Sequence, residues 1–241
     1  MKELNLFPDK NFWDGKNVFI SGHSGFKGGW LSLWLKELGA NVTGYSLEPN
    51  TKPSFYNACD IGSVTNSIFG NILDYKKLES SINKFKPEII IHMAAQALVL
   101  ESYKNPLNTY ETNIIGTLNI LEIIRNKSYV KVFINVTSDK CYENIEKKYS
   151  YKESDRMGGH DPYSSSKGCS ELVTSAYRLS FFNKKNNSSS CTSIASARSG
   201  NVVGGGDWSA DRLIPDFFRA VSQNKDMHIR HRNATRPWQH V

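Results

Sequence analysis

A serine, an aspartate and a lysine stand side by side where an apolar strand should end. Ser138, Asp139 and Lys140 follow the apolar run from Val130 to Val136. Together they bring a hydroxyl, a carboxylate and an amine to one place, and such groups can move protons on a bound substrate. The alternative is a charged turn that only ends the strand.

A tyrosine and a lysine form a second candidate pair. Tyr163 and Lys167 are four residues apart at a predicted helix start, so their side chains share one face. A free phenol has a pKa of about 10, and a fixed cation nearby favours its ionised form. The pair therefore predicts a phenol that takes a proton from a sugar or alcohol hydroxyl. Alone, this spacing is common on exposed helices and carries little weight.

A glycine-rich loop follows the first apolar strand. Gly22, Gly25 and Gly28 are spaced G-x-x-G-x-x-G between a strand and a helix. This pattern predicts a dinucleotide site, because glycine allows backbone and helix N-terminus to approach a pyrophosphate. The alternative is a purely structural turn. Ser46 stands where an acidic residue usually ends the second strand, and no arginine follows, so NAD is favoured over NADP.

The elements that must position these groups alternate along the chain. The pattern predicts strands at 17–21, 41–46, 64–70, 88–95, 130–136 and 191–198, and helices from the glycine loop to Gly39 and at 74–85, 108–126, 163–182 and 213–224. Strands 88–95 and 130–136 read as buried on both faces. The apolar face predicted for the first helix comprises Leu31, Trp34, Leu35 and Leu38. Such alternation predicts an α/β fold, a doubly wound parallel sheet with helices on both faces.

Composition narrows the function classes. The 241 residues are 39% hydrophobic and carry a net charge of +7, which suits a lysine-rich globular surface or an anionic small substrate better than nucleic acid. No apolar run is long enough to span a membrane and the N-terminus lacks an apolar signal core, so a cytoplasmic protein is expected. The four cysteines form no C-x-x-C pair, so we expect free thiols and no metal.

These motifs together resemble the extended short-chain dehydrogenase/reductase family, in its group of NAD-dependent epimerases and dehydratases. The resemblance covers nearly the whole chain, through "GHSGFKG", "HMAAQ", "TNIIGT", "VTSDKCY", "YSSSK", "SARSGNVVGGGDW" and "RPWQHV". It implies a Rossmann-type NAD-binding domain at 1–198 and the start of a nucleotide-sugar-binding region at 199–241. The family continues beyond this motif, so we expect the C-terminal substrate lobe to be mostly absent.

Within the family, "SLEPNTKPSFY", "TSDKCYEN", "GNVVGGGDW" and "ATRPWQHV" are similar to the branch that dehydrates CDP-sugars. The branch acting on dTDP-glucose carries Asp-Glu where this chain has Asp139 and Lys140. The resemblance implies a hydro-lyase that converts CDP-glucose to CDP-4-keto-6-deoxyglucose with catalytic NAD. Tyr163, supported by Lys167 and Ser138, would deprotonate the 4-hydroxyl as hydride passes to NAD. Lys140 would then remove the C5 proton, and Asp139 would protonate the leaving 6-hydroxyl.

The resemblance also implies binding residues. Those expected around the cofactor are Gly22, Ser24, Gly25, Phe26, Lys27, Gly28, Ser46, Asn71, Ile72, Ala94, Ala95, Gln96, Asn113, Thr137, Tyr163 and Lys167. Among them Asn71 and Ile72 would meet the adenine, and Asn113 would brace the catalytic centre. Substrate would contact Ser138, Asn201, Arg212 and Arg236.

The family further implies a homodimer through the helices that start near Asn108 and Tyr163, and a role in O-antigen or other lipopolysaccharide biosynthesis. Neither nucleic acid nor a membrane is expected as a partner. Three readings stay open beside this one: another nucleotide-sugar dehydratase, a 4-epimerase or reductase, and an inactive NAD-binding fragment.

Overall fold

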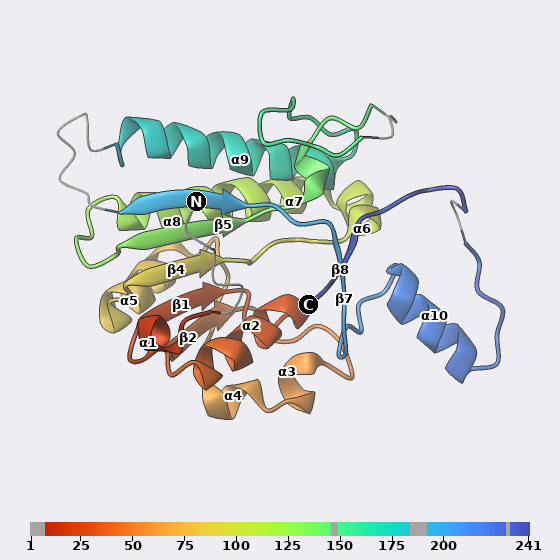
Figure 1. The fold of residues 1–241 in the computed structure, drawn as a ribbon, viewed down its shortest axis with the longest axis horizontal. Helices are drawn as coiled ribbons and strands as arrows, with labels where there is room; N and C mark the ends of the chain where they lie inside the picture. Colours follow the sequence, from red (N-terminus) through yellow and green to blue (C-terminus); the bar gives the residue numbers. More distant parts are fainter. Residues whose placement is uncertain (1–7, 146–148, 184–191, 230–231) are drawn as a thin grey trace.

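The computed structural model describes residues 8–145, 149–183, 192–229 and 232–241. Its centre is a six-stranded parallel sheet with the strand order β3-β2-β1-β4-β5-β6 (Figure 1). The strands are β1 Asn17–Ser21, β2 Asn41–Ser46, β3 Asn66–Phe69, β4 Ile89–His92, β5 Val132–Val136 and β6 Ser193–Ala197. The predicted α/β fold with a doubly wound parallel sheet is confirmed.

Helices connect the strands. They are α1 Lys10–Trp13, α2 Phe26–Glu37, α3 Phe55–Ala58, α4 Ile61–Val64, α5 Tyr75–Phe85, α6 Val99–Lys104, α7 Pro106–Tyr110, α8 Gly116–Ile124, α9 Pro162–Ser180 and α10 Leu213–Ser222, with the π-helix η1 Glu111–Ile115 and the 3₁₀-helix η2 Asp139–Cys141. Side-chain caps stabilise several of the starts, two of them at long helices. Asp74 accepts the backbone N–H of Lys77 before α5, and Asp161 accepts that of Ser164 before α9.

Two apolar clusters cover the two faces of the sheet. The larger joins Phe19, Ile90 and Phe133 of the strands to side chains of α5 and α8, such as Leu78 and Ile120. The smaller joins alternate strand residues to α2 and comprises Val18, Ile20, Leu35, Ala40, Val42, Ile89 and Ile91. Helices therefore pack on both faces. Because the strands of this sheet all pair in parallel, their carboxyl ends lie at one edge.

The structure corrects three details of the sequence analysis. Strand β5 is buried only at alternate residues, because Val132 and Val136 lie at the margin of the smaller cluster. Trp34 is 54% exposed, whereas Gly28, Gly29 and Ser32 are buried, because the glycine-rich first turn of α2 packs closest to the sheet. The single helix predicted at 108–126 is interrupted by η1, where the hydrogen-bond pattern widens to i→i+5.

The last segment contains a second, two-stranded sheet. Strands β7 Asn201–Val203 and β8 Trp238–His240 pair in parallel, and α10 lies between them in the sequence. In Figure 1, α10 stands apart from the six-stranded sheet, and none of its residues is buried. This arrangement is compatible with a boundary near residue 198, and the division at that residue stays a prediction.

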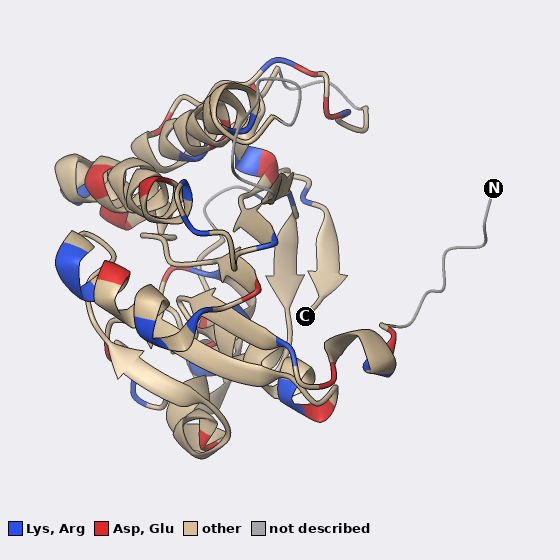
Figure 2. Cartoon of the chain, turned by 90° about the vertical axis from the view of Figure 1, so that its left-hand side faces the viewer, with Lys and Arg blue, Asp and Glu red and all other residues tan. Residues whose placement is uncertain are grey.

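Charged residues of both signs are interspersed over the face that Figure 2 shows. The net charge of +7 is therefore not gathered into one basic patch in that view. Among the residues that the structure describes, no helix is long and apolar enough to cross a membrane.

Candidate active site

The candidate residues gather at the carboxyl edge of the parallel sheet. The glycine loop follows β1, residues 93–98 follow β4, and the turn with Ser138 follows β5. Strand order reverses between β1 and β4, which is where ligands of open parallel sheets bind.

The glycine loop forms a tight cradle. Gly22 has a φ of +84°, and a Cβ there would lie 2.8 Å from the backbone N of Ala94. A Cβ on Gly28 would lie 2.1 Å from the carbonyl oxygen of Gly22. The N-cap of α2, Gly25, has no side-chain cap, so the first amides of the helix stay open toward an anion. This geometry fits a dinucleotide phosphate.

A buried histidine lies beneath the loop. The ring of His23 hydrogen-bonds the hydroxyls of Ser46 and Ser67, each at 3.0 Å. Burial lowers the pKa of His23 to about 4, so the ring is neutral at physiological pH. A Cβ on Gly44 would lie 2.1 Å from the ring. Sequence reasoning missed this role of His23, although a glycine within the neighbouring strand signals a close approach.

The predicted adenine end lies after β3. Tyr45 donates to the carbonyl oxygen of Asn71 at 3.0 Å, and the Asn71 side-chain oxygen accepts the backbone N–H of Leu73. Because a carbonyl oxygen has two lone pairs, Asn71 can still accept from an adenine amino group. Ile72 is buried in the larger apolar cluster. Ser24, in the glycine loop, donates to the carbonyl oxygen of Leu47 at 2.8 Å.

Asn113 braces the segment after β4. Its side chain accepts the N–H of Gln96 at 2.9 Å and donates to the Gln96 carbonyl and to Ser166 Oγ on α9. The side-chain amide of Gln96 donates to Thr109 Oγ1 at 2.8 Å and to the carbonyl oxygen of Leu98 at 3.1 Å. The backbone N–H groups of Met93 and Ala94 both donate to Ser21 Oγ. The predicted lining residues 94–96 are therefore held by β1, η1 and α9.

The phenol, the serine and the aspartate meet in one chain of hydrogen bonds. Tyr163 is 9% exposed, and its side chain hydrogen-bonds Ser138. Ser138 in turn donates to Asp139 Oδ1 at 3.1 Å. Burial raises the pKa of Tyr163, although the bond to Ser138 and the nearby Arg212 act in the opposite direction. The phenol is therefore neutral in this structure.

Lys167 lies deeper than its spacing suggested. It is 7% exposed, and its ammonium donates to the carbonyl oxygen of Val136 at 3.4 Å. Burial, followed by repulsion from Lys27, lowers the pKa of Lys167 to about 8. Sequence reasoning predicted that Lys167 favours ionised Tyr163. That effect stays a prediction, and Arg212 is a cation that lowers the pKa of Tyr163.

Lys27 points from the glycine loop toward the same place. Burial lowers its pKa, Arg212 lowers it further, and Asp139 and Asp207 act in the opposite direction. Arg212 forms an ion pair with Asp207 at 2.8 Å. The predicted cofactor residue Lys27 and the predicted substrate residue Arg212 therefore share one electrostatic neighbourhood with Asp139 and Tyr163.

Of the other predicted substrate residues, Asn201 lies on β7 of the two-stranded sheet and Arg236 lies before β8. The backbone N–H of Asn201 donates to the carbonyl oxygen of Pro237 at 2.9 Å. Arg236 is exposed and donates to the carbonyl oxygen of Thr235. The Asn201 contact joins β7 to the residue before β8, whereas the Arg236 contact is local to its own segment.

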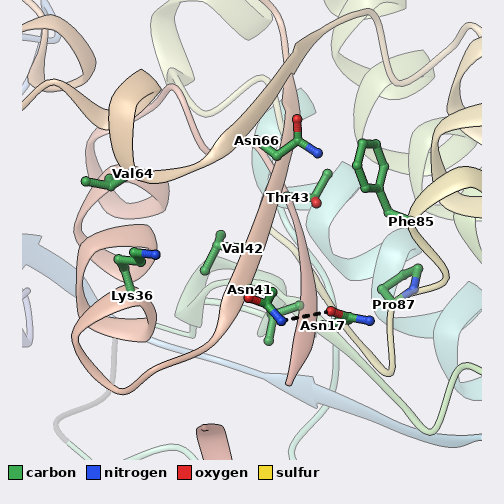
Figure 3. Close-up of a pocket in the computed structure, with 10 residues that line it drawn as sticks. Asn17, Lys36, Asn41, Val42, Thr43, Val64, Asn66, Phe85 and Pro87 are labelled. Carbon is green, nitrogen blue, oxygen red and sulfur yellow. Dashed lines mark hydrogen bonds between the residues drawn. The ribbon is translucent and has the colours of Figure 1, made fainter. Parts of the chain in front are cut away.

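Two cavities lie at different edges of the sheet. A cavity of about 280 Å³ opens at the amino ends of β1, β2 and β3 and contains none of the candidate residues (Figure 3). It is lined by polar residues such as Asn17, Lys36 and Asn66, and the turn with Ser138 is not part of its lining. A smaller cavity, of about 50 Å³, adjoins the glycine loop at Ser24, Gly25 and Phe26, and residues 206–209 close its other side.

Comparison with known proteins agrees with this geometry. CDP-glucose 4,6-dehydratase of Salmonella typhimurium is 53% identical over 233 residues, which are 97% of this chain and 65% of that protein. dTDP-D-glucose 4,6-dehydratase of Dictyostelium discoideum is 28% identical over 87% of this chain and 49% of its own length. The chain thus spans about two thirds or less of these relatives.

Solved structures share the fold. UDP-glucose 4-epimerase of Thermotoga maritima, in complex with UDP-glucose, superposes with a TM-score of 0.78 at 23% identity, over 93% of this chain and 69% of that one. dTDP-glucose 4,6-dehydratase of Bacillus anthracis, in complex with NAD, gives 0.75 at 22% identity, over 94% and 68%. The family described as GDP-mannose 4,6 dehydratase matches residues 19–241, so the chain belongs to that family.

Proposed function

We propose that this chain dehydrates CDP-glucose to CDP-4-keto-6-deoxyglucose as a hydro-lyase with catalytic NAD. The observation that carries the proposal is the hydrogen-bonded chain from Tyr163 through Ser138 to Asp139. An epimerase needs only a phenol and a hydroxyl to move the 4-hydroxyl proton. A dehydratase also needs an acid and a base for water loss, and Asp139 and Lys140 supply both.

NAD is the cofactor that the glycine loop fits. Gly22 and Gly28 leave space that a Cβ would fill, and the open N-terminus of α2 favours a pyrophosphate. The loop residues Ser24, Gly25, Phe26 and Lys27 would surround the phosphates, and Asn71 would meet the adenine. Residues 94–96, Thr137, Tyr163 and Lys167 would lie toward the nicotinamide. Bound NAD would accept a hydride from C4 of the sugar and return it to C6.

The chain's own residues would handle the protons. Tyr163 acts as the phenolate, a form that Lys167 and Arg212 would stabilise, and it becomes a neutral phenol when it accepts the proton of the 4-hydroxyl. The 4-ketone acidifies the C5–H bond, and Lys140 removes that proton as a neutral amine. Asp139 protonates the 6-hydroxyl, which leaves as water. Because Ser138 contacts both Tyr163 and Asp139, it offers a route by which the first proton reaches the carboxyl.

One comparison supports CDP as the nucleotide, and three side chains suit the diphosphate of any nucleotide sugar. The Salmonella relative at 53% identity is a CDP-glucose 4,6-dehydratase, and its similarity covers 97% of this chain. Arg212, Asn201 and Arg236 supply cations and an amide for a diphosphate, which suits the charge-assisted geometry of arginine. Arg212 would exchange its present partner Asp207 for the substrate.

The test is incubation of the purified chain with NAD and CDP-glucose, with dTDP-glucose and UDP-glucose in parallel. A 4-keto-6-deoxy sugar absorbs in alkali, so its formation from CDP-glucose alone supports the proposal. The same product from dTDP-glucose alone would assign another nucleotide-sugar dehydratase. A C4 epimer without a keto product would assign an epimerase. NAD bound without any turnover would leave an NAD-binding role.

We further propose a cytoplasmic homodimer that serves O-antigen or lipopolysaccharide biosynthesis. Exposed apolar side chains on the packed helices α7 and α9, among them Leu107 and Leu172, support the dimer. Free Cys59, Cys141 and Cys169 suit a reducing compartment. Sedimentation of the parent and of Leu172→Glu tests the dimer, because a charge at a dimer contact should shift the mass toward the monomer.

A further inference from the structure

We propose that Glu171 and Arg198 are positioning residues, which fix the turn carrying Ser138, Asp139 and Lys140 to the helix carrying Tyr163 and Lys167. The proposal rests on the function proposed above, and it concerns two side chains to which that function assigns no role.

Glu171 belongs to the same face of α9 as the catalytic pair. Tyr163, Lys167 and Glu171 follow one another at four-residue intervals, so their side chains line one side of the helix. All three are buried, and the Glu171 side chain is 4% exposed. The face that holds the phenol and the ammonium therefore ends in a buried carboxylate.

That carboxylate accepts hydrogen bonds from the start of the turn 137–142 and from the residue that follows β6. Arg198 approaches it with two nitrogens, Nε at 2.9 Å and Nη2 at 3.3 Å, in a bidentate pair. The hydroxyl of Thr137, the residue before Ser138, donates to the same carboxylate. Glu171 thus holds the entry to the turn directly.

Arg198 contacts the last residue of the turn, Tyr142. Its Nη1 donates to the hydroxyl of Tyr142 at 2.8 Å, and its guanidinium lies 4.8 Å from the centre of that ring. Tyr142 follows Lys140 by two residues. Next to Arg198, the carbonyl oxygen of Ser199 accepts the backbone N–H of Asp139 at 2.9 Å. One ion pair therefore ties both ends of the turn 137–142 to α9.

The charge state of the pair is consistent with this role. Burial alone would raise the pKa of Glu171, but hydrogen bonds from Arg198, Thr137 and Ser196 hold it below its ordinary value. Glu171 is therefore ionised at neutral pH, and its loss would leave a largely buried guanidinium without its counter-charge. The same carboxylate also favours the charged form of Lys167.

The experiment compares Glu171→Gln and Arg198→Lys with Glu88→Gln, which breaks the Lys16–Glu88 ion pair at the opposite edge of the sheet. Two readouts are used: kcat and KM for CDP-glucose with NAD, and the rate at which iodoacetamide labels Cys141, resolved by peptide mass. Cys141 lies within the turn and is fully buried, so its labelling reports opening of the turn without any substrate. Exposed Cys59 is the internal reference.

We expect Glu171→Gln and Arg198→Lys to lower kcat by about 100-fold with KM changed less than about threefold, because misplaced catalytic groups slow chemistry more than binding. Cys141 should label about tenfold faster than in the parent, while Cys59 and Glu88→Gln are unchanged. Arg198→Lys keeps the positive charge but cannot make the bidentate hydrogen bonds of a guanidinium. A low kcat with a melting temperature near that of the parent would therefore show a positioning role and not a loss of folding.

Parental kcat and parental Cys141 labelling in both variants would overturn the proposal. Parental labelling with reduced kcat would also overturn it, because the turn would then be in place. If the parent does not turn over CDP-glucose, the proposed function fails, and faster Cys141 labelling in the variants still supports the tie between turn and helix.

Discussion

Tyr163 and Asp139 are joined through a single hydroxyl. The Tyr163 side chain hydrogen-bonds Ser138, and Ser138 donates to Asp139 at 3.1 Å. Because a serine hydroxyl carries one proton, a neutral phenol must donate to Ser138, whereas an ionised phenol requires Ser138 to turn its proton away from Asp139. The protonation of the phenol and the hydrogen bonding of the carboxylate are therefore coupled, and the two ends of this chain should fail in different ways.

Replacement of Tyr163 by phenylalanine should stop the first step. Without the phenol, no group takes the 4-hydroxyl proton, so kcat should fall about 10²- to 10⁴-fold while NAD affinity stays near that of the parent. The measurements are formation of the alkali-absorbing product and fluorescence titration with NAD. Tyr177→Phe, on the same helix with its hydroxyl on Glu122, is the matched control and should keep parental rates. Normal turnover by Tyr163→Phe would contradict the assignment.

Replacement of Asp139 by asparagine should stop a later step. The amide cannot protonate the 6-hydroxyl, so product formation should fall about 10²- to 10⁴-fold while oxidation at C4 persists. In deuterated water the variant should still exchange hydrogen at C5 slowly, because Lys140 remains. Lys140→Met should abolish that exchange as well. Mass spectrometry of recovered CDP-glucose separates the two variants, and equal exchange in both would remove Lys140 from its role as base.

The sequence was sufficient for the sheet and for the glycine loop. Strand β4 is buried at every residue and is apolar up to its last residue, His92, so its pattern is clear, and local turn chemistry marks Gly22 and Gly28. Spacing on a helix is also local, so Tyr163 and Lys167 were placed on one face of α9 correctly. These inferences succeed because each depends on residues close together in the chain.

Contacts between distant segments could not be predicted in this way. The space that the His23 ring occupies depends on a glycine in β2. The ion pair between Glu171 and Arg198 depends on how α9 packs over β6. The depth of Lys167 could not be predicted, because the burial of an ammonium follows from tertiary packing and not from spacing. The short strands β7 and β8 carry too few residues for a period-2 pattern to be visible.

The buried ammonium of Lys167 should destabilise the folded protein at neutral pH. Its pKa is lowered from 10.5 to about 8, mainly by burial, which corresponds to about 3 kcal/mol against the charged form. This penalty is complete below pH 8, where both folded and unfolded chains are charged, and it is relieved between pH 8 and 10.5. Lys167→Met should therefore be inactive yet more stable than the parent at pH 7.

Urea unfolding of Lys167→Met and the parent at pH 7 and at pH 9.5 tests this sign. The advantage of the variant should shrink at the higher pH, because the folded parent then carries a neutral amine while its unfolded chain is still protonated. Destabilisation by the substitution at pH 7 would show that the hydrogen bond to the Val136 carbonyl outweighs the burial of the charge.

His92 should make the fold sensitive to mild acid. It lies fully inside the sheet, with Ser21 Oγ at 2.6 Å and Thr117 Oγ1 at 3.1 Å, and burial followed by repulsion from Lys167 lowers its pKa from 6.5 to about 3. Between pH 6.5 and about 3, His92 is therefore protonated in the unfolded chain and neutral in the folded chain. The contribution of His92 to the free energy of unfolding is fully present above pH 6.5. Below pH 6.5, this contribution falls by about 1.4 kcal/mol for each pH unit.

Replacement of His92 by glutamine removes that titration while leaving polar atoms for part of the network. Between pH 6.5 and 4.5, urea unfolding should show a pH slope about one proton smaller in His92→Gln than in the parent, whatever its stability at neutral pH. The pKa of His23 is also lowered, to about 4, so part of the pH dependence of stability should remain in His92→Gln. The exposed His160→Gln is the control and should keep the parental slope. An unchanged slope in His92→Gln would mean that the imidazole is already charged in the folded protein.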